Sequence, residues 1–465
     1  MKSLFALLFI FAIARKPAVA QSTYVTIPDA NFKAYLQNQY PLCFNANGQM
    51  DTTCNAILSA ISLTVASENI ADLTGIQYFK NLTDLTCYDN QLTSLPALPA
   101  SLTDLYCYTN QLTSLPALPA SLTQLSCNDN QLTSLPTLPA SLTILYCDNN
   151  QLASVPALPA SLTTLSCSEN QLTSLPALAA SLTYLDCDNN QLTSLPALPA
   201  SLTELYCYHN QLTSLPTLPA SLTNLDCNNN QLTRLPALPS LTDLACYYNQ
   251  LTSLPTLPAS LTNLFCDNNQ FTNLPALPAL TDLSCSYNQL TSLPTLPASL
   301  TNLYCNNNQI NGLPALPTSL VTLVCNDNII QCLPTLDDNL TSLYTANNQV
   351  TCLPNLPSSL TYSDIGTTVC SSPCTVGIAA IVVVVQGTDE VSIVPNPSAG
   401  SITLNSLQLK NTDVSIQGID GKIVYSQSGV SLPSPVIDLS GLSKGMYIMH
   451  LASGESVITK KLVME

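Results

Sequence analysis

Few side chains in this sequence could carry out catalysis. The 465 residues contain only two histidines, His209 in the middle of the chain and His450 near its end. An enzyme needs a nucleophile, a base or a set of ligands that converge on one place. No such constellation is evident around either histidine, so the sequence predicts a non-enzymatic protein that uses no cofactor and no metal.

The cysteines are a second possible source of chemistry. Thirteen of the nineteen recur at steps of nineteen or twenty residues: Cys87, Cys107, Cys127, Cys147, Cys167, Cys187, Cys207, Cys227, Cys246, Cys266, Cys285, Cys305 and Cys325. They occupy an apolar position of a repeated unit, and a free cysteine behaves as a small buried hydrophobe. We therefore expect a ladder of reduced core thiols, without bridges between neighbours because their side chains point the same way.

The other six cysteines lie outside that register: Cys43, Cys54, Cys332, Cys352, Cys370 and Cys374. In an exported chain, such cysteines are candidates for disulfides that stabilise the ends of the fold. Cys43 and Cys54 flank one loop, and Cys332 and Cys352 occupy equivalent positions in adjacent repeats. The pairing is left open by the sequence.

The repeat itself reads LxxLxCxxNQLTSLPxLPxS and occurs in fourteen copies, with Thr345 in place of cysteine in the last. A repeat of about 20 residues indicates a solenoid. Around Asp104 to Tyr108 the residues alternate, so Leu105 and Cys107 point to the core while the residues between them point outward. The asparagine after each strand, from Asn90 to Asn348, is expected to turn inward and form a hydrogen-bonded ladder.

This unit resembles the leucine-rich-repeat signature LxxLxLxxNxL. The resemblance implies a solenoid over residues 81–360 with a parallel sheet on its concave side. Proline fixes φ and removes a donor, so the return segments on the convex side should be extended and polyproline-like. Similar Leu-Pro repeats occur in type III-secreted effectors, but nothing here matches the ubiquitin-ligase domain that some of them carry.

The ends of the array differ from its middle. Residues 21–80 are predicted to form an N-terminal cap, with a helix that begins after Asp29 and an atypical first repeat over 61–79. The stretch LTGIQYFKNLTDL in this cap resembles the entry to internalin-like bacterial repeat proteins. Residues 361–386 are predicted to be a C-terminal cap and linker.

Residues 387–465 alternate apolar and polar residues between Gly, Pro and Asp turns, which predicts a small immunoglobulin-like β-sandwich. Pro395-Asn396-Pro397, Asp420-Gly421-Lys422 and Lys444-Gly445-Met446-Tyr447 are similar to motifs of the C-terminal sorting domain of type IX secretion. The resemblance implies that the type IX machinery is a partner. It also implies that the protein is secreted or held at the outer surface of a didermic bacterium.

Charge and hydropathy exclude some classes of partner and of membrane attachment. Residues 1–20 resemble a secretory signal peptide. Lys2, Arg15 and Lys16 lie in it, and without them the formal net charge of −17 becomes −20. Nucleic acid is a poor partner for such a chain. The apolar run Val376 to Val385 is too short for a membrane span, which needs about 20 residues.

The variable positions of the repeat are the two that flank the central leucine of the strand and the two that follow the cysteine. Between Leu82 and Thr345 they hold fourteen of the sixteen acids, whereas the one basic residue, Arg234, lies elsewhere. The acids are Asp84, Asp89, Asp104, Asp129, Asp148, Glu169, Asp186, Asp188, Glu204, Asp226, Asp243, Asp267, Asp282 and Asp327. The aromatic residues among them are Tyr88, Tyr106, Tyr146, Tyr184, Tyr206, Tyr208, Tyr247, Tyr248, Phe265, Tyr287, Tyr304 and Tyr344.

Rigid aromatic rings beside acceptors suit a protein or a glycan. We therefore predict an adhesion or recognition protein with a ligand-binding concave face. Its candidate residues are Tyr88, Asp104, Tyr106, Tyr146, Asp148, Tyr184, Asp186, Asp188, Glu204, Tyr206, Tyr208, Asp226, Tyr247, Phe265 and Tyr304. A structural surface component whose charges serve only solubility, and an enzyme dependent on His209, are the alternatives.

Overall fold

The computed structural model divides the chain into two compact units, Met1–Cys374 and Thr375–Glu465. The structure describes residues 23–364, 368–370, 392–394, 401–405, 412–418, 423–430, 436–439, 441–442, 445–453 and 456–464. The predicted signal peptide, Cys374 and most of the predicted linker, including the apolar run 376–385, lie outside the described residues. Among the residues described, no helix is long and apolar enough to cross a membrane.

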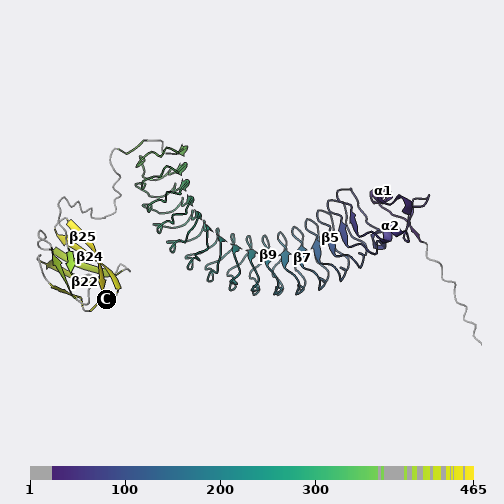
Figure 1. Cartoon of the computed structure of the whole chain (residues 1–465), viewed down its shortest axis with the longest axis horizontal. Helices are drawn as coiled ribbons and strands as arrows, with labels where there is room; N and C mark the ends of the chain where they lie inside the picture. Colours follow the sequence, from purple (N-terminus) through teal and green to yellow (C-terminus); the bar gives the residue numbers. More distant parts are fainter. Residues whose placement is uncertain are drawn as a thin grey trace, which may run out of the picture. The chain divides into compact units, whose positions relative to one another are not determined.

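The first unit is a curved solenoid built on one parallel sheet (Figure 1). The sheet has sixteen strands, which follow one another in chain order from β3 to β18. The strands are β3 (Ser62–Thr64), β4 (Asp84–Thr86), β5 (Asp104–Tyr106), β6 (Gln124–Ser126), β7 (Ile144–Tyr146), β8 (Thr164–Ser166), β9 (Tyr184–Asp186), β10 (Glu204–Tyr206), β11 (Asn224–Asp226), β12 (Asp243–Ala245), β13 (Asn263–Phe265), β14 (Asp282–Ser284), β15 (Asn302–Tyr304), β16 (Thr322–Val324), β17 (Ser342–Tyr344) and β18 (Tyr362–Ser363). This architecture confirms the predicted solenoid, and β18 extends the sheet just past the predicted boundary at residue 360.

Each repeat supplies buried residues to the core at the same four positions. In the repeat of β5 these are Leu102, Leu105, Cys107 and Leu112, each with no exposed surface. The central leucines of neighbouring strands are in register, as with Leu205 and Leu225. One repeat alone could not bury these side chains, so the stability of each depends on its neighbours. The return segments of the repeats contain neither helix nor strand, as their prolines predicted.

The ladder asparagines join neighbouring repeats through backbone groups. Asn210 donates from Nδ2 to the carbonyl oxygens of Cys187 (3.0 Å), Cys207 (3.2 Å) and Tyr208 (3.1 Å). Its Oδ1 accepts from the backbone N–H of Leu192 at 2.9 Å. These groups are buried, and leaving one unpaired would cost about 1–3 kcal/mol. The predicted asparagine ladder is confirmed.

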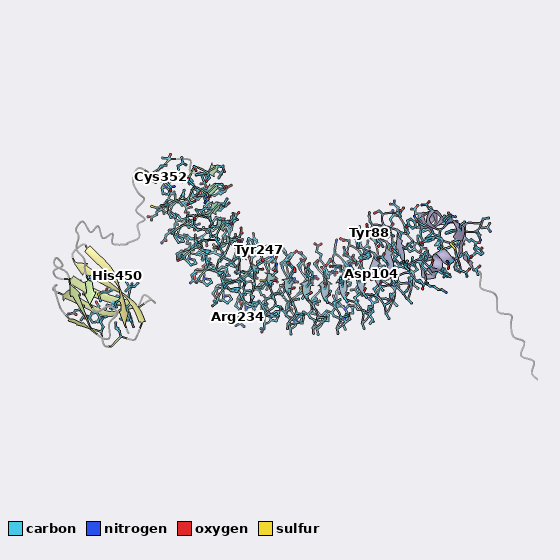
Figure 2. The ribbon with its side chains drawn as sticks, in the orientation of Figure 1. Tyr88, Asp104, Arg234, Tyr247, Cys352 and His450 are labelled. Atoms are coloured by element: carbon cyan, nitrogen blue, oxygen red, sulfur yellow. A yellow bond between two sulfur atoms is a disulfide. The ribbon has the colours of Figure 1, made fainter. Side chains whose placement is uncertain are left out.

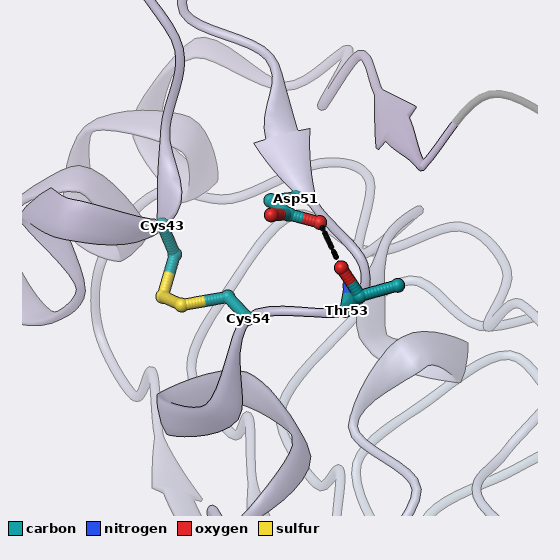
Figure 3. The surroundings of a disulfide bond; sticks show 4 residues. All are labelled: Cys43, Asp51, Thr53 and Cys54. Carbon is teal, nitrogen blue, oxygen red and sulfur yellow. Dashed lines mark hydrogen bonds between the residues drawn. A yellow bond between two sulfur atoms is a disulfide. The ribbon is translucent and has the colours of Figure 1, made fainter.

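The N-terminal cap closes the first end of the core. Its elements are β1 (Tyr24–Val25), α1 (Ala30–Gln39), η1 (Pro41–Cys43), β2 (Met50–Asp51), α2 (Asn55–Leu58) and η2 (Ile76–Tyr78). Asp29 caps α1 by accepting from the N–H of Phe32 at 2.8 Å, and Phe32 and Leu36 are buried against the first repeats. A disulfide joins Cys43 to Cys54, and the adjacent loop is held by a hydrogen bond from Thr53 to Asp51 (Figure 3).

The second unit contains two antiparallel sheets. One has the order β19 (Ser392–Val394), β20 (Ser401–Asn405), β23 (Val436–Asp438). The other has the order β22 (Ile423–Val430), β21 (Thr412–Gly418), β24 (Gly445–Ser453), β25 (Ser456–Met464). One buried cluster combines Ile437 of the first sheet with Ile416 and Met449 of the second. The two sheets thus share a core, as the sandwich prediction requires.

Candidate functional site

The side chains that vary between repeats gather on one surface, here called the sheet face. It consists of the two residues that flank the central leucine of each strand from β4 to β17, and the two residues that follow the cysteine. In β5 the central Leu105 is buried while Asp104 and Tyr106 are half-buried on the opposite side. Figure 2 labels Tyr88 and Tyr247 toward the inside of the arc and Arg234 toward its outside. The repeat framework therefore separates the variable acids from the one base.

The backbone of this face has an unusual conformation at one position of every repeat. The residue directly before each ladder asparagine has a positive φ, between 47° and 57° in the fourteen repeats. Nine of these residues are Asn or Asp, which tolerate the left-handed region best. The others are Thr109, Glu169, His209, Tyr248 and Tyr287. For a tyrosine this conformation is costly, so its presence there calls for a reason outside the framework.

Four carboxylates from the repeats of β7, β9 and β11 form what we call the acidic section: Asp148, Asp186, Asp188 and Asp226. Asp148 accepts from the hydroxyls of Ser166 and Ser168 in the next repeat. Asp188 is only 4% exposed and accepts from Asn189 at 2.8 Å. Asp226 accepts from the backbone N–H and the amide of Asn228. The carboxylates thus have neutral hydrogen-bond donors, and no lysine or arginine of the repeats occupies a position of this face, although His209 does.

Crowding of these acids changes their protonation. Burial, and then the charge of Asp188, raises the pKa of Asp186 from its ordinary value of 3.8 to about 7. Burial also raises the pKa of Asp226, an effect that its hydrogen bonds to Asn228 and the charge of His209 oppose. Burial of a carboxylate without a cation disfavours its charged form. A cationic group brought by a partner would therefore be stabilised at this section.

Tyrosines extend along the same face. The rings of Tyr88 and Tyr108 are stacked with centroids 4.5 Å apart, and those of Tyr184 and Tyr206 lie 5.6 Å apart. The hydroxyl of Tyr206 donates to Glu204 at 3.0 Å. Burial and this bond raise the pKa of Tyr206 to about 12, so it stays a neutral donor. Sequence reasoning missed Tyr108, although it has the same repeat position as Tyr88 and could have been found from it.

Next to the acidic section, toward the C-terminal end of the sheet, the face is hollowed. A pocket of about 330 Å³, here called the aromatic pocket, lies over β13 to β15. Its lining includes Tyr247, Tyr248, Phe265, Tyr287 and Tyr304, with Ser284 and Ser286 among the smaller residues. Tyr248 and Tyr287 are each 54% exposed. The predicted candidates Tyr247, Phe265 and Tyr304 are thus brought together in one cavity.

Polar groups complete this pocket. Asp267 Oδ1 accepts from the Ser284 hydroxyl at 2.5 Å and from the Ser286 N–H at 2.9 Å. The Ser286 hydroxyl donates to Asn306 Oδ1 at 2.6 Å. Asn268 also lines the cavity. Aromatic walls with a few fixed polar groups are the usual composition of a ligand pocket.

Not all of the candidates could contact one small ligand. Tyr88 belongs to the repeat of β4 and Tyr304 lies on β15. With about 4.8 Å between parallel strands, they lie roughly 50 Å apart along the sheet. The candidate site is therefore an extended face with a pocket in one part of it.

The other predicted sites are placed as follows. Among the described residues, no three His, Cys, Asp or Glu side chains are grouped so that they could hold a metal ion. The thirteen ladder cysteines are free and buried, and burial raises the pKa of Cys107 to about 12, so these thiols stay protonated. Cys352 is bonded to Cys370, and Cys332 is also disulfide-bonded. His209 is exposed, with the ring of Tyr208 as a neighbour at 5.7 Å.

Solved structures of bacterial repeat proteins resemble this chain. YopM of Yersinia pestis, a leucine-rich effector protein, is 37% identical with a TM-score of 0.60, over 67% of this chain and 89% of YopM. YopM of Yersinia enterocolitica is 35% identical with a TM-score of 0.56, over 64% of this chain and 76% of that one. InlJ of Listeria monocytogenes, whose functional domain includes a cysteine ladder, has a TM-score of 0.52 at 22% identity, over 90% and 93% of the two chains. It shares the fold alone.

Family comparison assigns both parts of the chain. Residues 160–200 match the model of leucine-rich repeats in two copies, and residues 392–465 match the secretion system C-terminal sorting domain. No curated protein sequence gives a significant match. Together with the repeats and the solenoid, these matches show that the chain belongs to the bacterial leucine-rich repeat proteins, as a secreted or cell-surface member with a type IX sorting domain.

Proposed function

We propose that this protein is an adhesion or recognition protein that binds a basic protein partner through the sheet face. The leucine-rich repeat fold is typical of non-enzymatic interaction scaffolds, which supports a binding role in general. The observation that carries the finer proposal is the segregation of charge. Fourteen of the sixteen acids between Leu82 and Thr345 occupy the variable positions of this face, and the one basic residue, Arg234, does not.

Two physical effects support a basic partner. The uncompensated acids create a negative potential that attracts and orients a positive surface. Tyrosines such as Tyr106 and Tyr206 add rigid apolar area with polar tips, which is the composition of many binding hot spots. Solubility alone would place charges on any exposed position, but it would not require aromatic rings among them.

A glycan is the second candidate ligand. The observation that favours it is the aromatic pocket, where the exposed rings of Tyr248 and Tyr287 lie beside amide and hydroxyl groups. Flat rings with adjacent polar groups could stack on a sugar ring and hydrogen-bond its hydroxyls. A glycan would not by itself account for the charge of the rest of the face.

The test is to display the purified full chain to arrays of surface proteins and of glycans. A variant with Tyr106, Tyr146, Tyr206 and Tyr208 changed to Ser removes aromatic area from the face. Thr217→Ala on a return segment is the matched control, because most other repeats have alanine at that position. Circular dichroism verifies that each variant is folded.

We expect saturable binding to a basic protein that is lost in the tyrosine variant, kept in Thr217→Ala and weakened by salt. Binding that is equal in all three proteins would contradict a role for the sheet face. A complete lack of saturable binding at low salt, with and without calcium, would favour a structural surface component.

A further inference from the structure

The aromatic pocket exists because small and large residues alternate across adjacent strands. Phe265 on β13 pairs with Ser284 on β14, which pairs with Tyr304 on β15. Ser286 follows Ser284 and is likewise small. The repeat of β14 therefore leaves a gap between two aromatic side chains that stand two strands apart.

We propose that this pocket receives an arginine side chain of the basic protein partner. The inference rests on the proposed function, since it identifies the group that the partner inserts. It assigns to the pocket the role of an anchor, while the rest of the face supplies long-range attraction.

The dimensions of the gap suit a planar cation. Two parallel strand spacings place the backbones of β13 and β15 roughly 10 Å apart. A flat group that contacts a ring on each side needs about 7–8 Å between the rings, because carbon atoms in contact lie about 3.5–4 Å apart. A guanidinium is planar and weakly hydrated, and it stacks on aromatic faces more readily than an ammonium does.

The polar groups of the pocket suit the donors of a guanidinium. The hydrogen bonds of Asp267 to its protein neighbours, as far as the chain is described, both go to Oδ1. Its other oxygen is thus available to accept from a ligand. The only lysine or arginine of the repeats, Arg234, lies on a return segment, and neither it nor His209 lines this pocket. A cation that pairs with Asp267 in this pocket would therefore be supplied by a partner.

Two tyrosines of the pocket occupy positions that the framework gives to other residues. Tyr248 and Tyr287 have φ values of 50° and 53°, where six equivalent residues of other repeats are asparagine. A bulky side chain in the left-handed region costs free energy that asparagine largely avoids. Both of these exceptions line the same cavity. A ligand that contacts their rings explains why the repeat departs from its preferred residue twice at this place.

The decisive experiment compares an oligo-arginine peptide with an oligo-lysine peptide of equal length, titrated into the full-length protein and followed by calorimetry. The two peptides have equal charge, so attraction to the acidic face affects both. The variant Tyr248→Asn/Tyr287→Asn introduces residues that the framework already uses at these positions. Phe265→Ser is an independent second variant, because Ser126 and Ser166 occupy the equivalent strand position. His209→Asn makes the same kind of change outside the pocket.

We expect the wild-type protein to bind the arginine peptide about tenfold more tightly than the lysine peptide, as one or two stacked rings would provide. The double variant and Phe265→Ser should lose this preference, and His209→Asn should keep it.

Equal binding of both peptides to the wild-type protein would overturn the pocket assignment and leave the basic-partner proposal standing. If neither peptide binds at low salt, both the pocket assignment and the basic-partner proposal are overturned. Displacement of the arginine peptide by a neutral oligosaccharide, dependent on Phe265, would instead reassign the pocket to a glycan.

Discussion

The acidic section and the aromatic pocket are built on the same backbone but differ in chemistry. In both, a buried central leucine, Leu185 or Leu283, separates two outward residues, and a ladder asparagine follows. In the acidic section, Asp186 and Asp226 follow the central leucine and Asp148 and Asp188 follow the cysteine, and these carboxylates accept from Ser and Asn. In the pocket, the residue after the central leucine alternates between ring and hydroxyl, as Phe265, Ser284 and Tyr304 on successive strands. A repeat framework can thus keep its hydrogen bonds constant while a few positions determine what each part of the face can bind.

The largest effect is expected where the two regions are the same. Leu205→Ala, beneath the acidic section, and Leu283→Ala, beneath the pocket, each remove a fully buried side chain. Each should lower the free energy of unfolding by about 2–5 kcal/mol. Urea denaturation measures it. If only one of the two variants lost stability, the buried leucines would not contribute equally to stability in the two regions.

Binding kinetics should separate the regions. Asp148→Asn, Asp186→Asn and Asp188→Asn combined should slow association with a basic partner about tenfold and weaken its salt dependence, because steering depends on long-range charge. Phe265→Ser should mainly speed dissociation. Surface plasmon resonance over a range of salt concentrations measures both. If the association rate of the charge variant is unchanged, the acidic section does not steer the partner, and the two regions would not differ in their roles.

The acidic section should make stability depend on pH between about pH 4 and pH 8. Because the pKa of Asp186 rises from 3.8 to about 7 on folding, its protonated form favours the folded state. That stability is fully present below about pH 4 and is lost as pH rises through about 7. Asp186→Asn should therefore melt like the wild type near pH 4 and at a higher temperature near pH 8.

Thermal melts at several pH values measure this effect. Phe265→Ser in the pocket is the control, because it replaces one uncharged side chain with another. Its melting temperature should differ from that of the wild type by the same amount near pH 4 and near pH 8. A pH profile unchanged by Asp186→Asn would contradict the raised pKa.

The smallest effect concerns the strained tyrosines of the pocket. Tyr248→Asn should raise the free energy of unfolding by about 0.5–1 kcal/mol, because asparagine accepts a positive φ at less cost. A matched change, Asn229→Tyr in the acidic section, places a tyrosine at the equivalent position, where φ is 50°, and should lower stability by a similar amount. Chemical denaturation of both variants measures these two changes in the free energy of unfolding. A loss of stability in Tyr248→Asn would show that the ring contributes more to folding than its backbone costs.

Most of the framework could be predicted from the residues. The period of the repeat, with Leu105 and Cys107 alternating with polar neighbours, predicted the strand, its buried side and the asparagine ladder. Such features depend on local alternation and on self-similarity, which a sequence displays directly. The cysteines outside the register also stood apart in the sequence, but only the structure paired Cys43 with Cys54 and Cys352 with Cys370.

The tertiary structure alone decided which variable residues meet. The stack of Tyr88 on Tyr108, the raised pKa of Asp186 and the cavity between Phe265 and Tyr304 all depend on side chains from different repeats. A sequence shows which positions vary, whereas the packing of small against large residues across strands sets the depth of a pocket and the burial of a charge. The sequence by itself therefore determined the solenoid, the C-terminal sorting domain and the variable positions that make up the sheet face. The tertiary structure determined which part of that face forms a pocket that could hold a ligand.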